Sequence, residues 1–418
     1  MELRLRYGRQ ETGLDVPDAR VVEIAHPPAA PPVEDIGAEL ARALVSPHGP
    51  HLSSAVRRGD NVLLMTVDHT RPNPSAFLWR LAERLETMGA DVAVIAGLGI
   101  HRQMTDDELL AFYRTDDILQ PDSRSADQWR IGVTSRGTPV EVSPHLREYN
   151  KRIVVGFVEP QYIAGFSGGR KMVVPSVASY DAVTHNHFLT VLQDRRLGVL
   201  DGNPVHEDMM EAAAMTGLHY VCDAVVNPDD TIASIHCGDW IGAHRAACAD
   251  SARLYQAHVA ERADIVITSP GGYPYDIDMV QAKKALVPAM ECVREGGVII
   301  LVGECERGWG ADTPDMSLLS PETAPARVAE MRQGIREGRC EWHWGPSSTG
   351  LLFASVVFGA KATLIVVSRL QAELEGTIAQ AAPDLQTALQ MAEEIVGANG
   401  KIIAIRDGRR AIVTVGDG

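Results

Sequence analysis

The chain has 418 residues, of which 45% are hydrophobic and 22% charged, and its net charge is −16. This composition is ordinary for a globular protein, and about 100–200 residues per domain predicts two domains. The negative charge disfavours nucleic acid and anionic membrane surfaces as partners, although local Lys and Arg residues can still bind an anionic substrate. No apolar run approaches the length of a membrane helix, so we expect no membrane partner.

The cysteines indicate a reducing compartment. All six lie between residues 222 and 340, and none forms a C-x-x-C pair. In a chain of this length they are typical of reduced thiols rather than of a disulfide framework or a zinc site. The N-terminus, MELRLRYG, alternates in polarity and predicts a strand, not a signal peptide. We therefore expect a cytoplasmic protein.

Short apolar runs alternate with amphipathic patterns in the first half of the chain. A Pro-rich stretch at 26–35 is typical of a connector. Buried strands are predicted over 61–68, 91–99 and 152–159, with a helix over 74–89 between the first two.

A second series begins near residue 262. It predicts strands over 263–270, 296–304 and 362–368, helices over 276–294, 322–337 and 384–397, and a closing hairpin over 401–416.

This alternation predicts the α/β class: two α/β domains with mostly parallel sheets and helices on both faces. We expect an N-terminal domain over 1–258, completed by 398–418, and a C-terminal domain over 259–397. Functional loops of such sheets lie at the carboxyl ends of the strands. The active site is therefore expected in the cleft between the domains.

The segment 159–187, EPQYIAGFSGGRKMVVPSVASYDAVTHNH, carries the most information. Its Gly-rich turn lets backbone N–H groups approach an anionic ligand, and Lys171 ends that turn. A lysine there can neutralise charge or, if desolvated, act as a nucleophile. His187 follows sixteen residues later and can hold a metal, although the neighbouring His185 leaves that assignment open by spacing alone.

Other interpretations of this loop are available. Many Gly-rich turns are only turns. The separation of Gly165 and Lys171 fits a phosphate loop, so a nucleotide-binding ATPase or transferase is a candidate. Against it, Arg170 replaces the second Gly of that pattern and Met172 replaces the hydroxyl that binds magnesium.

Two further motifs follow predicted strands in the first half. In DHTRPNP, at 68–74, Asp68 can hold a ligand N–H and Arg71 offers a planar fork for a carboxylate or phosphate. The same residues also suit a plain strand-to-helix turn. His101 follows the next strand and precedes a helix opened by a capping box of Thr105 and Glu108. A histidine there can be a general base or an incidental loop residue.

The second half offers a helix face and an aromatic cluster. Gln281 and Lys284 are three residues apart, so they share one helix face that can bind a substrate carboxylate and hydroxyl, or be only solvated surface. Trp342, His343 and Trp344 stand together in a chain with 5% aromatic residues. They either wall a pocket or pack between elements.

Taken together, these motifs resemble the lactate racemase family. The resemblance runs from DHTRP near residue 68 to the Gln-x-x-Lys helix at 281–284, and AGFSGGRK with the later His is its most specific part. It implies a racemase or epimerase of a 2-hydroxy acid or sugar acid. It also implies nickel and a nickel-pincer nucleotide, pyridinium-3,5-bisthiocarboxylic acid mononucleotide.

The resemblance assigns roles to residues of this chain. Lys171 resembles the lysine that is covalently attached to the cofactor, and His187 resembles the histidine that completes the nickel coordination. His101 resembles one of two acid/base histidines. The remaining counterparts are cofactor-contacting Asp68, His69, Thr70 and Arg71, and substrate-binding Arg71, Gln281 and Lys284.

The chemistry implied by the resemblance is hydride transfer. A base takes the proton of the substrate α-hydroxyl, the hydride moves to the cofactor, and its return to the other face inverts the carbon. The cofactor performs the hydride chemistry, and the protein orients the substrate and moves protons. The implied partners are a hydroxy-acid substrate and the proteins that synthesise the cofactor and insert nickel.

The sequence departs from the family at one catalytic position. The second acid/base histidine stands ten residues before the cofactor lysine, where this chain has Gln161. An amide only donates or accepts hydrogen bonds near neutral pH. Glu159, Tyr162 or His185 could replace it, or His101 could serve both faces. Alternatively, the enzyme is a one-sided redox catalyst or the chain is a non-catalytic cofactor carrier. We expect a substrate other than simple lactate.

Overall fold

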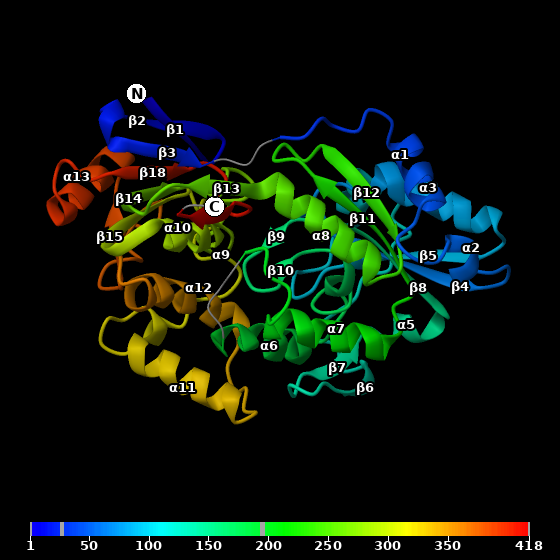
Figure 1. The fold of residues 1–418 in the computed structure, drawn as a ribbon. Coiled ribbons are helices and arrows are strands. Elements are labelled where there is room, and N and C mark those ends of the chain that lie inside the picture. The colour runs from blue at the N-terminus through cyan, green and yellow to red at the C-terminus, as the bar shows by residue number, and fades with distance from the viewer. Residues whose placement is uncertain (1, 26–28, 193–196, 417–418) are drawn as a thin grey trace.

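The computed structural model describes residues 2–25, 29–192 and 197–416. Two domains lie side by side, each built on a sheet with helices packed against it (Figure 1). This is the predicted α/β class with mostly parallel sheets. No helix within the described residues is both long enough and apolar enough to span a bilayer.

The sheet of the first domain has five strands in the order β12-β11-β8-β4-β5. They are β4 (Asn61–Val67), β5 (Asp91–Gly97), β8 (Lys151–Val158), β11 (Tyr220–Val226) and β12 (Ile232–Gly238). All pair in parallel except β12, which runs antiparallel to β11 at the edge. The central strands are apolar at nearly every position because both faces of the sheet are covered.

The helices of the first domain cover this sheet. They include α1 (Ile36–Val45) against β12, α3 (Ser75–Thr87) against β5, and α8 (Gly242–Tyr255) against β11 and β12. The amphipathic pattern predicted over 74–89 corresponds to α3, which buries Phe77, Leu78 and other apolar residues.

The sheet of the second domain has six parallel strands in the order β17-β16-β15-β14-β18-β3. They are β3 (Val21–Ala25), β14 (Ala263–Thr268), β15 (Val293–Val302), β16 (Thr363–Val367), β17 (Ala379–Ala382) and β18 (Ile402–Ile405).

Successive residues of these strands enter different clusters, as the alternation of a strand requires. Ile265 and Ile267 pack with the hairpin of β1 (Glu2–Tyr7) and β2 (Gln10–Asp15) and with α13 (Leu385–Val396). Val266 enters the main core instead, which also holds apolar residues of α10 (Leu286–Cys292) and α12 (Trp344–Ala354). The N-terminal hairpin and α13 therefore cover one face of the sheet.

The remaining helices and strands of the described residues complete the two domains. They are α2 (Leu52–Ala55), α4 (Asp106–Tyr113), β6 (Trp129–Val133), β7 (Pro139–Val142), α5 (His145–Glu148), β9 (Pro160–Gln161), β10 (Gly165–Phe166), α6 (Tyr180–Phe188), α7 (Pro204–Thr216), β13 (Gln256–Val259), α9 (Met279–Ala282), α10 (Leu286–Cys292), α11 (Ala324–Arg336), α12 (Trp344–Ala354) and β19 (Ile412–Val415), with short 3-10 and π turns between them.

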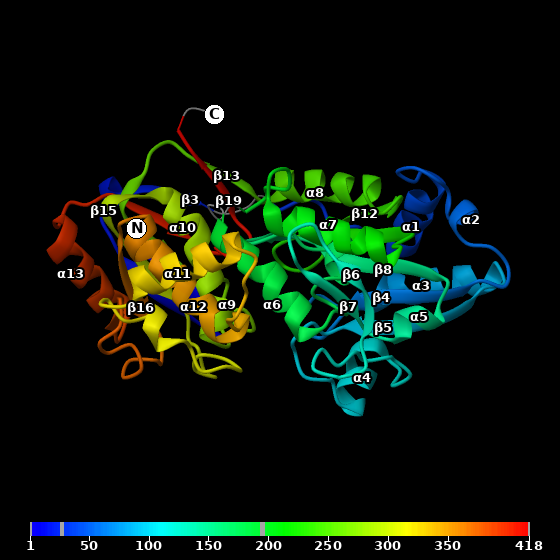
Figure 2. The same cartoon turned by 90° about the horizontal axis from the view of Figure 1, so that it is seen from below.

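In each sheet the direction in which successive strands are added reverses at one strand, β4 in the first domain and β14 in the second. In the first domain β5 and β8 lie on opposite sides of β4, and in the second β15 and β18 lie on opposite sides of β14. Ligands of such sheets bind beyond the carboxyl ends of the strands at these reversals. Figure 2 shows α6 and α9 in the region where the two domains meet.

The structure corrects the expected course of the chain ends. The segment 398–418 does not complete the first domain, because β18 lies inside the sheet of the second. The expected hairpin over 401–416 is wrong: β18 pairs with β14 and β3, while β19 pairs in parallel with β13. Residues 2–25 also belong to the second domain, through β3 and through the β1–β2 hairpin that packs on its sheet.

Two expected elements shift at their boundaries. The helix expected over 276–294 is a series of shorter turns, with α9 beginning after Asp278 and α10 ending at Cys292. Residues 26–28 of the expected connector lie outside the described residues. The rest of it, 29–35, forms no helix or strand before α1.

Candidate active site

Asp68 and His101 form a hydrogen-bonded pair at the carboxyl ends of two neighbouring strands. Asp68 follows β4 and His101 follows β5, and His101 Nδ1 lies 2.7 Å from Asp68 Oδ2. The Asp68 side chain is 3% exposed, whereas that of His101 is 39% exposed. The buried carboxylate therefore holds the imidazole through Nδ1 and leaves Nε2 for another partner.

The Asp68 carboxylate is ionised. Burial raises its pKa, but the hydrogen bond and charge of His101, the charge of Arg71 and the Thr70 hydroxyl outweigh burial and lower the pKa to about 2. Thr70 donates to Asp68 Oδ1 through its hydroxyl, at 2.6 Å, and through its backbone N–H, at 3.1 Å. Both carboxylate oxygens of Asp68 are therefore engaged within the protein.

The rest of the DHTR segment lies closer to the surface. Arg71 is exposed, and its Nη1 donates to the Thr70 carbonyl oxygen at 3.0 Å. His69 is exposed and lies near Glu108, whose pKa its charge helps to lower after the larger effect of Arg102. The capping box of Thr105 and Glu108 is present as predicted.

Lys171 lies in a 3-10 turn that begins at Gly169 and is partly buried. Burial and the positive charges of Arg170, Arg71 and Lys284, in that order, hold its pKa well below the ordinary value. The charged side chains that act on it are thus all cationic. A lysine in such surroundings favours the neutral amine.

His187 lies on α6, near Lys171. Burial, with a further contribution from the Lys171 charge, lowers the His187 pKa to about 3, so the imidazole is neutral. Its Nδ1 lies 3.2 Å from Asn186 Oδ1, and Asn186 donates its amide to Asp208 at 2.7 Å. With Asn186 orienting the ring through Nδ1, Nε2 keeps a lone pair.

The aromatic cluster of the second domain packs against α6. The Trp344 ring lies 5.4 Å from the His187 ring and 5.5 Å from that of Phe188, and Trp342 lies 5.9 Å from Phe188. Both tryptophans are buried. The cluster therefore packs between elements of the two domains and also forms one side of the surroundings of His187.

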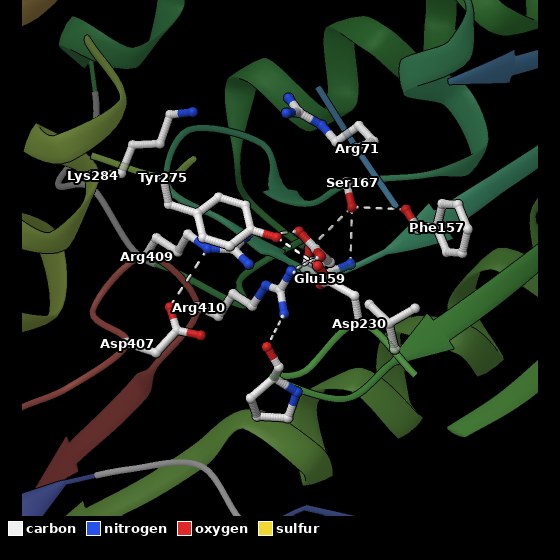
Figure 3. Close-up of polar contacts among 12 residues, drawn as sticks. Arg71, Phe157, Glu159, Ser167, Asp230, Tyr275, Lys284, Asp407, Arg409 and Arg410 are labelled. Carbon is white, nitrogen blue, oxygen red and sulfur yellow. Dashed lines mark hydrogen bonds and ion pairs between the residues drawn. The ribbon is translucent and has the colours of Figure 1, made fainter. Parts of the chain in front are cut away.

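Gln281 lies in α9 and Lys284 in the 3-10 turn that follows it, beyond the carboxyl end of β14. Lys284 Nζ donates to Gln281 Oε1, as their predicted common helix face requires. Burial and the charges of Arg71 and Arg409 lower the Lys284 pKa to about 7, against smaller raising effects of Asp278 and Glu159. In Figure 3 the ends of Lys284 and Arg71 point toward each other.

Gln161 has a structural task in the turn between β9 and β10. Its Oε1 accepts the backbone N–H groups of Ile163, at 2.9 Å, and Ala164, at 2.6 Å. The side chain thus closes the turn that leads into the Gly-rich loop.

The residues considered as replacements for the second histidine are buried or have other partners. His185 Nδ1 lies 3.0 Å from the Thr138 hydroxyl, beside β7. Tyr162 is buried. Glu159 is buried in ion pairs, and although burial raises its pKa, the charges of Arg410, Arg409 and Arg71 lower it below the ordinary value.

A buried ion-pair network joins the domains beside Lys284 (Figure 3). Arg410 Nη2 lies 2.6 Å from both Glu159 Oε1 and Asp230 Oδ1. Arg409 Nη1 lies 3.3 Å from Glu159 Oε2. Tyr275 donates its hydroxyl to Asp230 at 2.6 Å and stacks on the Arg409 guanidinium at 3.4 Å. Glu159 and Asp230 come from the first domain and the other three from the second.

The sequence pattern does not reveal this network. Arg409 and Arg410 lie in RDGRR, directly after β18, where the pattern predicts the turn of a hairpin. The available signal was a basic pair at the end of an apolar run, since such ends carry functional loops in parallel sheets.

Arg71, Lys171, His187 and Lys284 thus lie close enough together that the charge of one lowers the pKa of another. The Asp68–His101 pair lies at the same end of the first sheet, and the His101 charge acts on Asp278, the N-cap of α9. Among the described residues, no group of three or more His, Cys, Asp and Glu gathers as a metal site.

Comparisons with known proteins identify relatives of this chain. Residues 7–198 match the lactate racemase N-terminal domain, and residues 259–413 match the lactate racemase C-terminal domain. The lactate racemase of Thermoanaerobacterium thermosaccharolyticum is 30% identical over 98% of this chain and 99% of its own length. That of Lactiplantibacillus plantarum is 31% identical over 65% of this chain and 67% of its own length.

Solved structures agree. The lactate racemase apoprotein from T. thermosaccharolyticum superposes with a TM-score of 0.88 at 28% identity, covering 99% of this chain and 100% of that one. A protein from Thermotoga maritima shares the fold, with a TM-score of 0.65 at 15% identity over 92% of this chain and 100% of its own. With both domain families matched over most of its length, the chain belongs to the lactate racemase family.

Proposed function

We propose that this protein is an isomerase that inverts the α-carbon of a 2-hydroxy acid or sugar acid, using a nickel-pincer nucleotide attached to Lys171. The observation that carries the proposal is the pairing of a lysine amine surrounded by cations with a neutral, buried imidazole close to it. A neutral amine suits covalent attachment, and a neutral imidazole suits a nickel ligand.

The residues present fit this cofactor. His187 Nε2 would hold the nickel, because Nδ1 is turned toward Asn186. The Lys171 amine would carry the covalent bond, and Arg71 lies close enough to both Lys171 and Lys284 to balance anionic groups. When bound, the cofactor supplies the acceptor for the hydride of the substrate α-carbon.

The substrate would be held from the second domain. The Lys284 ammonium and the Arg71 guanidinium bind the carboxylate, and Gln281 positions Lys284 through its amide oxygen. His101 Nε2 takes the proton of the α-hydroxyl, while Asp68 stabilises the imidazolium through Nδ1. The ion-pair network beside Lys284 keeps the two domains in the orientation that this requires.

Gln161 limits which substrates we expect, because it cannot act as the second acid/base group. Its carbonyl oxygen closes a turn and its amide cannot exchange protons, so we assign all proton transfer to His101. The keto acid formed from the substrate would then have to turn its other face toward the returning hydride while its carbonyl oxygen stays within reach of His101, which returns the proton to that oxygen. A substrate other than simple lactate, such as a polyhydroxy acid with groups that can exchange places, suits this reorientation.

The test uses protein made in a host that synthesises the cofactor and inserts nickel. We expect nickel by elemental analysis, a mass adduct on Lys171, and interconversion of the two configurations of at least one member of a hydroxy-acid panel, followed by chiral chromatography. Lys171→Ala should lose the adduct, whereas Lys361→Ala, which removes an exposed lysine, should keep it. Absence of the adduct from the wild type would refute the cofactor assignment. Accumulation of keto acid without inversion would identify a one-sided redox enzyme.

A further inference from the structure

Arg170, the residue before Lys171, is completely buried in the Gly-rich loop. Its Nη2 donates to the Ala164 carbonyl oxygen at 2.6 Å, and its Nη1 lies 3.4 Å from the carbonyl oxygens of Ser167 and Gly168. The same Nη1 lies 2.7 Å from His244 Nε2. The guanidinium therefore ties the loop to α8.

His244 links Arg170 to a buried carboxylate. Its Nδ1 lies 2.9 Å from Asp223 Oδ2, and both side chains are at most 2% exposed. Burial and the Arg170 charge lower the His244 pKa, so the ring is neutral at neutral pH. It donates from Nδ1 to Asp223 and accepts from Arg170 at Nε2. We call this chain of contacts the Asp223–His244–Arg170 relay.

The backbone of the Gly-rich loop packs directly against this relay. The Gly169 N–H lies 3.4 Å from Asp223 Oδ1. A Cβ on Gly169 would lie 2.6 Å from the His244 ring, and one on Gly168 would lie 2.7 Å from Val158. The φ angles of Gly168 and Gly169 are also positive, +74° and +48°, which glycine adopts without strain. The two glycines thus permit a contact that fixes the position of Arg170, and with it the turn that carries Lys171.

The relay maintains a positive charge beside Lys171. Burial lowers the Arg170 pKa, but only to about 10, so the guanidinium stays protonated at neutral pH. Burying a charge is costly unless it is hydrogen-bonded, and the relay supplies those bonds. The other charged groups facing Lys171 are Arg71 and Lys284, which are also cationic.

We propose that the Asp223–His244–Arg170 relay is a positioning device: it holds a buried guanidinium in one place, and with it the turn that carries Lys171, so that the Lys171 amine faces a fixed positive charge. Its biological meaning rests on the proposed function, in which this amine receives the cofactor. Arg170 acts through Lys171 and touches no reacting atom. Repulsion by a nearby like charge disfavours the ammonium form, and the relay prevents the guanidinium from turning away.

The test measures Lys171 itself in cofactor-free protein. Trace acetic anhydride acylates unprotonated amines: a new N–C bond replaces a C–O bond of the anhydride, acetate leaves, and the amine proton passes to water. The rate is followed from pH 6 to 10 by mass spectrometry of a digest, with the exposed Lys361 as internal reference. The readout is the midpoint of each pH profile, which does not depend on how easily the reagent reaches the amine.

We expect the Lys171 midpoint to lie well below that of Lys361. Arg170→Met should raise it by about one pH unit, because the buried like charge no longer opposes protonation of the amine. Arg170→Lys should retain most of the effect because it keeps the charge. Arg152→Met, which removes another partly buried arginine that donates to the Thr216 carbonyl oxygen, should leave the midpoint unchanged.

An unchanged midpoint in Arg170→Met would overturn the inference. Equal shifts in Arg170→Met and Arg170→Lys would do the same, since they would indicate a packing effect. If Arg170→Met fails to fold, His244→Leu decides, because it keeps the guanidinium but removes its anchor, and an upward shift of the midpoint is then required. The result is independent of nickel and turnover. Failure of the proposed function therefore leaves it standing, and the reverse also holds.

Discussion

Asp68 and His101 act as a unit because a buried acceptor selects one tautomer of the imidazole. Asp68→Asn keeps the size of the side chain but replaces the carboxylate oxygen that receives the Nδ1 proton. We expect kcat for racemisation to fall by about 10²–10⁴-fold. The adduct mass on Lys171 should be unchanged, which separates this effect from loss of cofactor. An unaltered kcat would contradict the role of Asp68 as the group that orients His101.

Lys284 gives the site a pH dependence. Its pKa, ordinarily 10.5, is lowered to about 7 by burial and by Arg71 and Arg409. As the pH rises above about 7 the free protein loses the ammonium, so affinity for a hydroxy-acid anion should fall by up to about tenfold per pH unit. The same shift makes the unfolded chain bind more protons between pH 7 and 10.5, so this residue's contribution to stability rises with pH over that range.

Calorimetric titration of cofactor-free protein, between pH 6 and 9, with the hydroxy acid that the panel identifies as substrate measures the effect on binding without interference from catalysis. Lys284→Arg is the matched control, because a guanidinium stays charged throughout. The variant should bind with little pH dependence. A wild-type affinity that stays flat across the range would show that Lys284 is not the titrating anchor.

Among the elements, the turn between β9 and β10 depends most on one side chain. Gln161→Ala removes the oxygen that accepts the N–H groups of Ile163 and Ala164. We expect a loss of about 1–3 kcal/mol in the free energy of unfolding. Gln161→Glu keeps acceptor oxygens and should lose less. Denaturant unfolding of the three proteins checks this, and equal stability of the alanine variant would mean that solvent replaces the bonds without cost.

Element boundaries were largely predictable where one local pattern dominates. The apolar runs over 61–68, 91–99 and 152–159 are β4, β5 and β8, because a strand buried on both faces must be apolar throughout. The capping box of α4 was equally local. The hairpin expected over 401–416 failed for the opposite reason. Two apolar runs around a short polar turn suit a hairpin, but each run pairs with a strand far away in the sequence.

At the scale of the whole molecule, the network around Glu159 and Arg410 connects the domains. Arg410→Met would leave the buried Glu159 carboxylate and the partly exposed Asp230 carboxylate without their common partner. We expect the free energy of unfolding to fall by about 3–5 kcal/mol. Lys361→Met is the control: it breaks an ion pair with Glu295 whose side chains are 63% and 71% exposed, and should cost less than about 1 kcal/mol.

Denaturant unfolding followed by separate probes of the two domains measures this prediction. Trp79 reports on the first domain and Trp309 on the second, because each is partly buried in its core. Loss of the network should lower the midpoint of unfolding. If Arg410→Met were as stable as Lys361→Met, the network would contribute no more to the free energy of unfolding than a surface ion pair does.

The sequence by itself determined the α/β class, the Gly-rich loop ending at Lys171, and the residues that resemble a lactate racemase. These depend on local periodicity and on motifs with fixed spacing. Only the tertiary structure decided that β3 and β18 belong to the second sheet with the β1–β2 hairpin packed against it, that Asp68 holds His101, and that Arg409 and Arg410 meet Glu159. Parallel strands pair across long sequence separations, and the charges that set each pKa come from loops that only folding brings together.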